Sequence, residues 1–326
     1  MGNNLKDAKD KVLCNICQRR EAFYHRPYSG EKLCRRCFGR SIEEKVRATI
    51  SQHDMFQYND RIAVAVSGGK DSLGLLHILA KIEQDYPKVS LTAITIDEGI
   101  REYRDEALEI TVENCKVLGI EHYTLSFREL YGHTMDEIAS NLKQTRRAKL
   151  TPCAYCGVLR RKALNIAARK VKADKIATAH TLDDESQTFL LNMVHGNLSR
   201  MARESSSTDG SHPKLVQRVK PFCEIPERDT ALYSYVKGMR FQSIQCPYAS
   251  EALRNDIRSF LNRMEQKHPG IKFTIFRSAE RISRALRETS TEEKLSECVN
   301  CGEPASENLC KACEMFRKLF DDVSKS

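Results

Sequence analysis

The sequence has no uninterrupted apolar stretch approaching the roughly 18 residues that a membrane-spanning helix needs, so we expect no transmembrane segment. Its first residues, 1–7, are polar and lack the hydrophobic run of a secretory signal peptide. Lys6 also stands where a myristoylation motif has serine or threonine. The sequence therefore predicts a cytoplasmic protein with no membrane partner.

Disulfide bonds are not expected either, although the chain contains 13 cysteines. In a reducing compartment, so many cysteines favour metal binding or redox chemistry. Eight of them form two pairs of Cys-x2-Cys knuckles, namely Cys14, Cys17, Cys34 and Cys37, and Cys298, Cys301, Cys310 and Cys313. Four cysteines at such spacing are typical of a tetrahedral zinc site that folds a segment too small for its own core. We therefore predict two structural Zn²⁺ ions, with disulfides or a redox pair as the alternative.

Positive charge exceeds negative charge, with 53 Lys and Arg against 44 Asp and Glu, a net charge of +9. The excess is concentrated between Lys143 and Lys175, where eleven basic residues accompany one acid, Asp174. Such a run is either a solvated helix face or a surface for a polyanion, and we favour contact with a nucleic acid. The aromatic and basic fragment 24–28 is a second place where RNA could bind, or a plain turn.

A glycine-rich turn, Ser67-Gly68-Gly69-Lys70-Asp71-Ser72, lies between an apolar run at 62–66 and leucines at helical spacing in 73–79. This context predicts a buried parallel strand, a tight turn and the start of a helix. Backbone N–H groups and the helix dipole then converge on one point and bind an anion. The glycines allow phosphate to approach the backbone, and Asp71 could hold Mg²⁺ against it. A turn without a ligand is the alternative.

This turn is not a Walker A loop, which has four residues between its first glycine and Gly-Lys-Ser/Thr. It resembles the pyrophosphate loop of the PP-loop ATP pyrophosphatases. Those enzymes cut ATP between the α- and β-phosphates to adenylate an oxygen of a substrate. The resemblance implies that ATP binds at 67–72.

Apolar runs and amphipathic stretches alternate along the chain and predict its fold. Strands are expected at 62–66, 91–97, 122–125, 175–180 and 215–220, and helices at 40–53, 101–118, 151–170, from 181 and from Cys246 onward. The alternation predicts an α/β fold, a doubly wound parallel sheet with helices on both faces. The expected units are a zinc finger at 1–40, a linking helix at 41–54, a PP-loop domain at 55–290 and a second zinc finger at 295–316. The serine-rich stretch 204–210 is predicted to be a loop.

Five cysteines lie outside the knuckles. Cys115 falls on the apolar stripe of a predicted helix and is expected in the core. Cys153 and Cys156 form a CxxC between a proline and a glycine, and Cys246 precedes a proline at a predicted helix start. From the residues alone, this set fits redox, zinc or iron–sulfur chemistry.

The order of these motifs resembles one family. The N-terminal knuckles, SGGKDS, PCxxCG with a basic pair, HTLDDxxQT, CPY and the C-terminal knuckles together resemble the TtuA/NcsA family of tRNA 2-thiouridine synthetases, relatives of the tRNA-cytidine thiolase TtcA. The resemblance spans Cys14 to Cys313. It implies that Cys153, Cys156 and Cys246 bind a [4Fe–4S] cluster, and it leaves Cys223 as a packed thiol. Three protein ligands leave one iron open to deliver sulfur.

The resemblance further implies a two-stage reaction. The C2 oxygen of a uridine attacks the α-phosphate of ATP, pyrophosphate leaves, and sulfide carried by the cluster then replaces the adenylated oxygen. Family matches for ATP binding, beside the loop residues 67–72, are Ala65, Val66, Ser67, Asp71, Ile96, Arg160 and Ala179. The resemblance assigns catalysis to Asp184, Arg160 and Asp71. A helix-capping role is the alternative for Asp184.

Arg160 stands where members that modify the T-loop carry lysine. Arginine is always charged and cannot act as a general base, so it would clamp phosphate or adenylate. The stretch 156–161 is closer to the archaeal and eukaryotic enzymes, so we favour the wobble uridine (position 34) over the T-loop uridine (position 54). The expected partners are tRNA, a second copy of the chain, and a sulfur donor that is either sulfide or a ubiquitin-like protein thiocarboxylate. Another PP-loop tRNA-modifying ATPase and a zinc-ribbon RNA-binding scaffold without catalysis are the alternatives.

Overall fold

The computed structural model of the chain describes residues 12–86, 88–144, 150–203, 212–249, 252–289 and 295–321. At its centre is a parallel five-stranded sheet with the order β5-β4-β3-β6-β7. The strands are β3 (Arg61–Ala65), β4 (Ser90–Asp97), β5 (Glu121–Ser126), β6 (Lys175–Ala177) and β7 (Gln217–Val219). The chain builds this sheet outward from β3 in one direction and then in the other, which confirms the predicted α/β fold with a parallel sheet.

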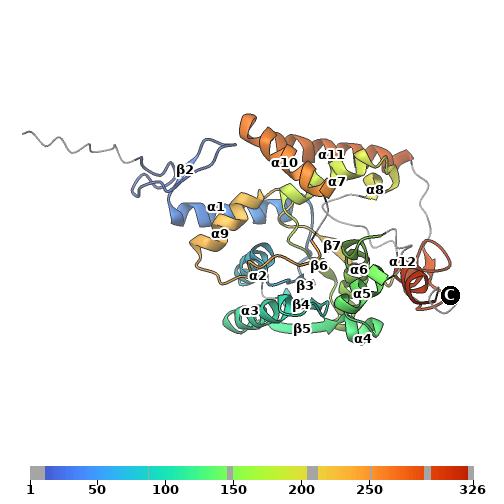
Figure 1. Ribbon diagram of the computed structural model, residues 1–326. Coiled ribbons are helices and arrows are strands. Elements are labelled where there is room, and N and C mark those ends of the chain that lie inside the picture. Colours follow the sequence, from blue (N-terminus) through green and yellow to red (C-terminus); the bar gives the residue numbers. More distant parts are fainter. Residues whose placement is uncertain are drawn as a thin grey trace, which may run out of the picture.

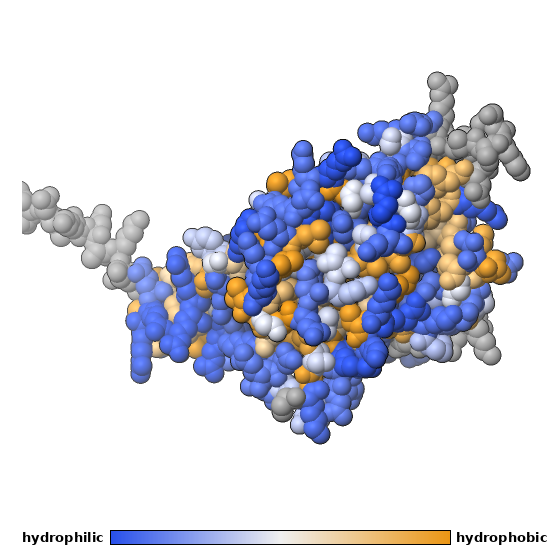
Figure 2. All heavy atoms as spheres, turned by 90° about the horizontal axis from the view of Figure 1, so that it is seen from below, coloured by the Kyte–Doolittle hydropathy of each residue, from blue (hydrophilic) through white to orange (hydrophobic). Residues whose placement is uncertain are grey.

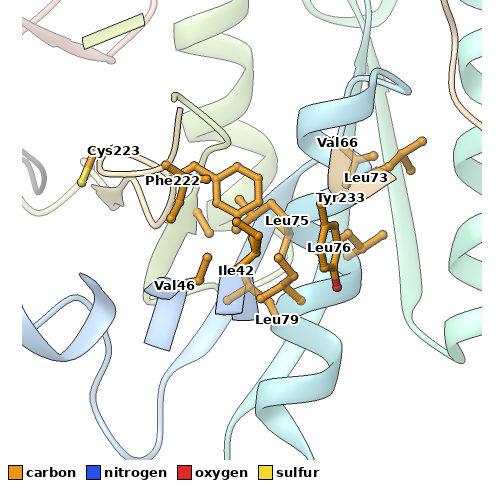
Figure 3. Close-up of a cluster of buried hydrophobic side chains, with 14 of the residues drawn as sticks. Ile42, Val46, Val66, Leu73, Leu75, Leu76, Leu79, Phe222, Cys223 and Tyr233 are labelled. Carbon is orange, nitrogen blue, oxygen red and sulfur yellow. The ribbon is translucent and has the colours of Figure 1, made fainter. Parts of the chain in front are cut away.

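Helices cover both faces of the sheet (Figure 1). On one side are α2 (Lys70–Glu83) and α3 (Tyr103–Leu118), and on the other are α5 (Met135–Gln144) and α6 (Pro152–Lys170), with α4 (Phe127–Tyr131) after β5. Two further helices, α1 (Arg35–Gln52) and α9 (Glu227–Val236), pack over α2. Figure 3 shows this contact as a core of aliphatic and aromatic side chains, in which Ile42 and Val46 lie near Leu75, Leu79 and Phe222.

A separate helical layer lies beyond the sheet, at the top of Figure 1. It contains α7 (Leu182–Val194), α8 (Leu198–Arg203), α10 (Ala252–Lys267) and α11 (Ile271–Thr289). Its small core joins three of these helices through Phe189, Met201 and Ala279. Because α7 follows β6 directly, this layer is anchored at the carboxyl edge of the sheet.

The two sets of knuckle cysteines form two compact modules. Each has a two-stranded antiparallel sheet and a helix whose N-cap is the third cysteine, Cys34 or Cys310. Their elements are β1 (Tyr24–His25) and β2 (Lys32–Leu33) before α1, and β8 (Ser296–Glu297), β9 (Pro304–Ala305), α12 (Lys311–Phe316) and the π-helix η1 (Arg317–Asp321). In each module the four sulfur atoms lie within 4.8 Å of one another. The predicted convergence of two four-cysteine sets is therefore confirmed.

Two predicted helix boundaries were wrong. The helix expected from Arg40 begins at Arg35, because Cys34 caps it, and it therefore contains Cys37. The helix expected from Cys246 begins only at Ala252. Residues 246–249 instead form a turn closed by a hydrogen bond from the Ala249 N–H to the Cys246 carbonyl, 3.0 Å long. The predicted loop at 204–210 and part of the basic block, residues 145–149, lie outside the described residues.

In Figure 2 most of the visible face is hydrophilic, and hydrophobic residues form patches between charged ones. Among the helices described, none combines the length and the apolar character required to cross a lipid bilayer.

Gly68 allows a test of the turn between β3 and α2. Its φ is +85°, and a Cβ at this position would lie 2.7 Å from the carbonyl oxygen of Ala107 in α3. We expect Gly68→Ala to lower the free energy of unfolding by at least about 2 kcal/mol, because it adds both backbone strain and a clash. Gly69→Ala is the matched control. Its Cβ would meet only the Ser67 Oγ at 3.5 Å, so we expect a loss below about 1 kcal/mol. Equal urea midpoints for the two variants would contradict this geometry.

Candidate active site

The glycine-rich turn joins β3 to α2, with Gly69 as the N-cap of the helix. Ser72 closes it, because its hydroxyl donates to the Gly69 carbonyl (3.0 Å) and accepts from the Ser67 N–H (3.1 Å). The Ser67 hydroxyl lies 3.1 Å from that of Ser72. Ser72 therefore shapes the turn, and the start of α2 directs its unsatisfied N–H groups to the same point.

Lys70 and Asp71 form a charged group beside this turn. The Lys70 ammonium lies 2.7 Å from Asp71 Oδ2 and 3.1 Å from Glu227 Oε1. The Thr230 hydroxyl donates to the other oxygen of Asp71. Burial raises the pKa of the Asp71 carboxyl, although the Lys70 ammonium acts in the opposite direction. A positive charge and a carboxylate are thus held at the mouth of the anion site.

Three cysteines gather at the other side of the site. Cys153 and Cys156 lie in the first turn of α6, which begins with Pro152 and the N-cap Thr151. The turn containing Cys246 reaches them, because the Cys153 thiol donates to the Tyr248 carbonyl over 2.6 Å. Among the described residues, these sulfur atoms do not form a set within 4.8 Å as the knuckle cysteines do. A [4Fe–4S] cluster binds its thiolates at separate irons, so its ligands need not converge as tightly as those of one small ion.

An ion-pair network, buried at Glu98 and Arg104, connects the glycine-rich turn to α6, the helix that carries Cys153 and Cys156. Arg160 lies one helical turn after Cys156, and its guanidinium is 3.6 Å from Glu98 Oε1. Arg104 Nε lies 2.9 Å from the other oxygen of Glu98, and its two terminal nitrogens donate to the carbonyls of Ser67 (3.0 Å) and Ile96 (2.6 Å). The side chains of Glu98 and Arg104 are only 5% and 4% exposed. The network therefore joins the turn to the residues around the cysteines.

Glu98 and Arg104 are candidate site residues that were not predicted from the sequence. A signal existed for Glu98, because it directly follows β4 at the edge of the sheet where ligands bind. Arg104 gave no such signal. It lies in the first turn of α3, in a charged stretch that is typical of a solvated helix face. Only the fold shows that its side chain turns inward.

The HTLDD motif forms the start of α7. Thr181 is the N-cap, and Asp184 completes a capping box by accepting from the Thr181 N–H (2.9 Å) and hydroxyl (2.8 Å) with Oδ2. Asp184 therefore has the helix-capping role that was the alternative to a catalytic role. Beside it, His180 is reached by solvent, yet surrounding protein and the cations Lys220 and Arg218 lower its pKa to about 4. The imidazole is neutral at pH 7.

The predicted nucleotide-contacting residues converge at one edge of the sheet. Val66 continues β3 by donating its N–H to the Ile94 carbonyl over 2.9 Å. Ile96 lies near the end of β4, and Ala179 lies two residues after β6, the two strands on either side of β3. Both four-cysteine modules are built apart from this edge, from elements of their own. The arrangement can hold a polyphosphate next to three thiols.

The aromatic and basic fragment 24–28 is used for docking. The hydroxyls of Tyr24 and Tyr28 donate to the two carboxylate oxygens of Asp229 in α9, over 2.7 and 2.8 Å. Arg26 Nε lies 3.3 Å from the same carboxylate. These polar groups attach the N-terminal module to α9, which favours the structural interpretation of the fragment over RNA contact.

The two remaining cysteines are core residues. Cys115 is buried in α3, and burial raises the pKa of its thiol to about 11. Cys223 is fully buried beside Phe222 at the edge of the core shown in Figure 3. Neither side chain has the access that a reactive thiol needs, and among the described residues neither belongs to a group of converging metal ligands.

Comparison with known proteins identifies relatives over nearly the whole chain. A family model described as "PP-loop domain" matches residues 40–265. The chain is 33% identical to a "Probable sulfurtransferase" of Methanocaldococcus jannaschii, over 97% of this chain and 91% of that protein. It is 38% identical to "Cytoplasmic tRNA 2-thiolation protein 1" of Chlamydomonas reinhardtii, over 94% of this chain and 85% of that protein.

Two NcsA proteins are similarly close. The chain is 33% identical to "tRNA 2-thiolation protein NcsA" of Haloferax volcanii, over 94% of this chain and 98% of that protein. Among solved structures, it matches the U34-tRNA thiolase NcsA from Methanococcus maripaludis with its [4Fe–4S] cluster. That match has a TM-score of 0.81 and 31% identity and covers 95% of this chain and 97% of the other.

The Glu98 network predicts a difference between two charge-removing variants. Glu98→Gln leaves the Arg104 guanidinium buried without its counter-charge, so we expect it to lower the free energy of unfolding by about 3 kcal/mol or more. Glu113→Gln is the control, because Glu113 pairs with Arg240 at the surface and both side chains are about half exposed, so the loss should stay below about 1 kcal/mol. Urea denaturation measures both values. A Glu98→Gln protein as stable as the control would show that the network contributes no net stability.

Proposed function

The chain belongs to the PP-loop family of tRNA 2-thiolation proteins, and we propose that it replaces the C2 oxygen of a tRNA uridine, the wobble uridine foremost, with sulfur in an ATP-dependent reaction. One observation carries the proposal. The glycine-rich turn and the three-cysteine set meet at the carboxyl edge of the sheet and are joined through Glu98, Arg104 and Arg160. The U34-tRNA thiolase from M. maripaludis, which has a [4Fe–4S] cluster, supports the assignment.

The turn at 67–72 would bind the phosphates of ATP. Backbone N–H groups at the start of α2 and the Lys70 ammonium offer positive charge to the departing pyrophosphate. Asp71 supplies the carboxylate for Mg²⁺, because it lies at the same point and is oriented by Thr230. The nucleoside would lie along the strand ends at Ala65, Val66, Ile96 and Ala179.

Arg160 and Asp184 would act on the uridine and the α-phosphate. Uracil is a poor electrophile, and adenylation turns its C2 oxygen into a leaving group. Arg160 stays charged and clamps the phosphate, while Glu98 fixes the direction of its guanidinium. The capping bonds of Asp184 hold its carboxylate in one orientation at the start of α7. Because arginine replaces the lysine of T-loop enzymes, we favour the wobble uridine.

Cys153, Cys156 and Cys246 would hold the [4Fe–4S] cluster. The donor set fits, since three thiols from a helix start and a neighbouring turn lie in one region, and a cluster does not require them to converge on a single ion. When bound, a cluster with three protein ligands supplies one open iron that can carry the sulfur. Burial raises the pKa of Cys156 to about 11, so binding must displace the proton of this thiol.

The two four-cysteine modules would each hold one Zn²⁺ ion. Four converging thiols fill the coordination shell of zinc completely, which suits a structural and not a catalytic ion. The partners we propose are tRNA, a sulfur donor that is either sulfide or a protein thiocarboxylate, and a second copy of the chain. The name "cytoplasmic" in its relatives supports a cytoplasmic location.

Asp71→Asn tests the ATP-dependent step. This variant keeps a hydrogen-bond acceptor for Thr230 but removes the metal-binding charge, so we expect release of pyrophosphate in the presence of tRNA to fall at least about 100-fold. Nucleoside analysis of the tRNA should show 2-thiouridine at the wobble position with the wild-type protein only. Asp85→Asn, at the exposed pair with Arg47, is the control. A wild-type protein that binds tRNA but releases no pyrophosphate would favour the RNA-binding scaffold.

Cys246→Ala tests which cysteines bind the cluster and which bind zinc. We expect this variant to lose the visible iron–sulfur absorption after anaerobic reconstitution while it retains two equivalents of zinc, because Cys246 lies outside both four-cysteine sets. Cys223→Ala is the matched control and should keep both the cluster and the zinc, since its thiol is buried in the core. Loss of zinc from Cys246→Ala, or a full cluster in it, would falsify the ligand assignment.

A further inference from the structure

Helix α6 presents two different sets of side chains on two faces. Cys153, Cys156 and Arg160 follow the i, i+3, i+7 spacing of one helical stripe and point to the candidate active site. Tyr155, Lys162 and Arg169 recur at every seventh position and form a second stripe. At 3.6 residues per turn, the two stripes lie about 150° apart around the helix. The second stripe is therefore directed away from the active site.

The C-terminal four-cysteine module packs on this second stripe. The Tyr155 hydroxyl donates to the Met315 carbonyl of α12 over 3.5 Å, and Arg169 forms an ion pair with Glu303. Lys214, whose carbonyl accepts from Arg169, donates to the Gly302 carbonyl over 2.8 Å. These contacts place the module along the length of α6, on the side opposite the three cysteines.

Lys162 makes the most unusual of these contacts. Its ammonium lies 3.2 Å from Cys301 Sγ and 3.8 Å from Cys310 Sγ, two of the four sulfurs of the module. The Asn300 amide donates to a third sulfur, Cys313 Sγ, over 3.3 Å. A lysine of α6 thus contacts the candidate metal-binding sulfur atoms of a module in another part of the chain.

We infer that Lys162 is a positioning residue through which metal bound at the C-terminal four-cysteine site holds α6, and with it Cys153, Cys156 and Arg160, in place. The four sulfurs fit a zinc ion, because they lie within 4.8 Å of one another and form a complete tetrahedral donor set. Four thiolates around Zn²⁺ leave a net charge of −2, which a lysine ammonium partly neutralises. N–H···S bonds to metal-bound thiolates are strong because the acceptor is charged.

The consequence for the active site follows from the rigidity of a helix. The first turn of α6 carries two of the three cysteines, and its position is set by whatever packs on its opposite face. Loss of metal from the module removes the charged partner of Lys162 and loosens the packing of α12 on Tyr155. The N-terminal module packs elsewhere, on α9 through Asp229, so it offers an internal comparison.

Zinc release tests the Lys162 contact. Lys162→Met keeps the length of the side chain but removes the charge, so we expect a chelator to remove one of the two zinc equivalents at least about 10-fold faster than from wild type. Lys162→Arg keeps the charge and the donors and should restore slow release. Lys214→Met disturbs docking without touching a sulfur atom and should release zinc as wild type does. Equal release from Lys162→Met and wild type would overturn the role of Lys162.

Hydrogen exchange tests the effect on α6. Cys301→Ser removes one ligand at the exposed corner of the C-terminal site, and we expect at least about 10-fold faster amide exchange in residues 153–160. Cys17→Ser is the matched control, because Cys17 occupies the same position in the N-terminal knuckle and should leave α6 unchanged. Unchanged exchange in Cys301→Ser, or equal changes in both variants, would overturn the inference.

The link to sulfur chemistry rests on the proposed function, and the two can fail separately. If the wild-type protein takes up no iron–sulfur cluster, the proposed function fails. The zinc-release and exchange measurements need no cluster, so they still decide whether the module holds α6. If the cluster forms in wild type, it should be lost faster on chelator treatment from Lys162→Met than from Lys162→Arg. Equal loss from both would overturn this link.

Discussion

The buried pair of Glu98 and Arg104 is the interaction on which the site depends. Arg104 holds two carbonyls, one in the glycine-rich turn and one at the end of β4, while Glu98 reaches across to Arg160 on the other face of the sheet. Through this pair, side chains link the turn to α6. Burying two charges is costly, and a well-packed apolar pair of the same volume would give similar or greater stability. The network is therefore better explained by the direction it gives to Arg160 than by stability.

The same edge of the sheet explains why phosphate and thiol sites lie together. Parallel strands end at one edge, and the residues that follow β3, β4 and β6 meet there: the glycine-rich turn, Glu98, and the segment leading into the capped start of α7. The starts of α2, α6 and α7 present N–H groups or capping side chains at the ends of these helices. The proposed thiolation, in which ATP activates a base before sulfur replaces its oxygen, needs both sites within one such region.

Much of the fold could be predicted from local patterns. Around Gly68, the spacing of apolar residues and the paired glycines indicate the strand, the turn and the helix. The Cys-x2-Cys spacings predict that four sulfur atoms converge in each module without any knowledge of the tertiary structure. The start of α10 could not be predicted in this way, because Cys246 and Pro247 resemble a helix start but close a turn against α6. Arg104 was missed for a related reason. Its inward direction depends on carbonyls that lie 37 and 8 residues earlier in the chain.

The position of the C-terminal module shows what sequence patterns leave out. Its four cysteines indicate a metal site, but nothing in their spacing says that Lys162 of α6 will contact two of them. The seven-residue recurrence of Tyr155, Lys162 and Arg169 is visible in the sequence, yet such a basic stripe is equally typical of a solvated or RNA-binding face. Once the module covers this stripe, Lys162 and Arg169 are engaged with the protein itself. Any positive charge that α6 offers to an RNA must then come from other basic residues of this helix. The number of basic residues in the segment therefore overstates the basic surface that is available to tRNA.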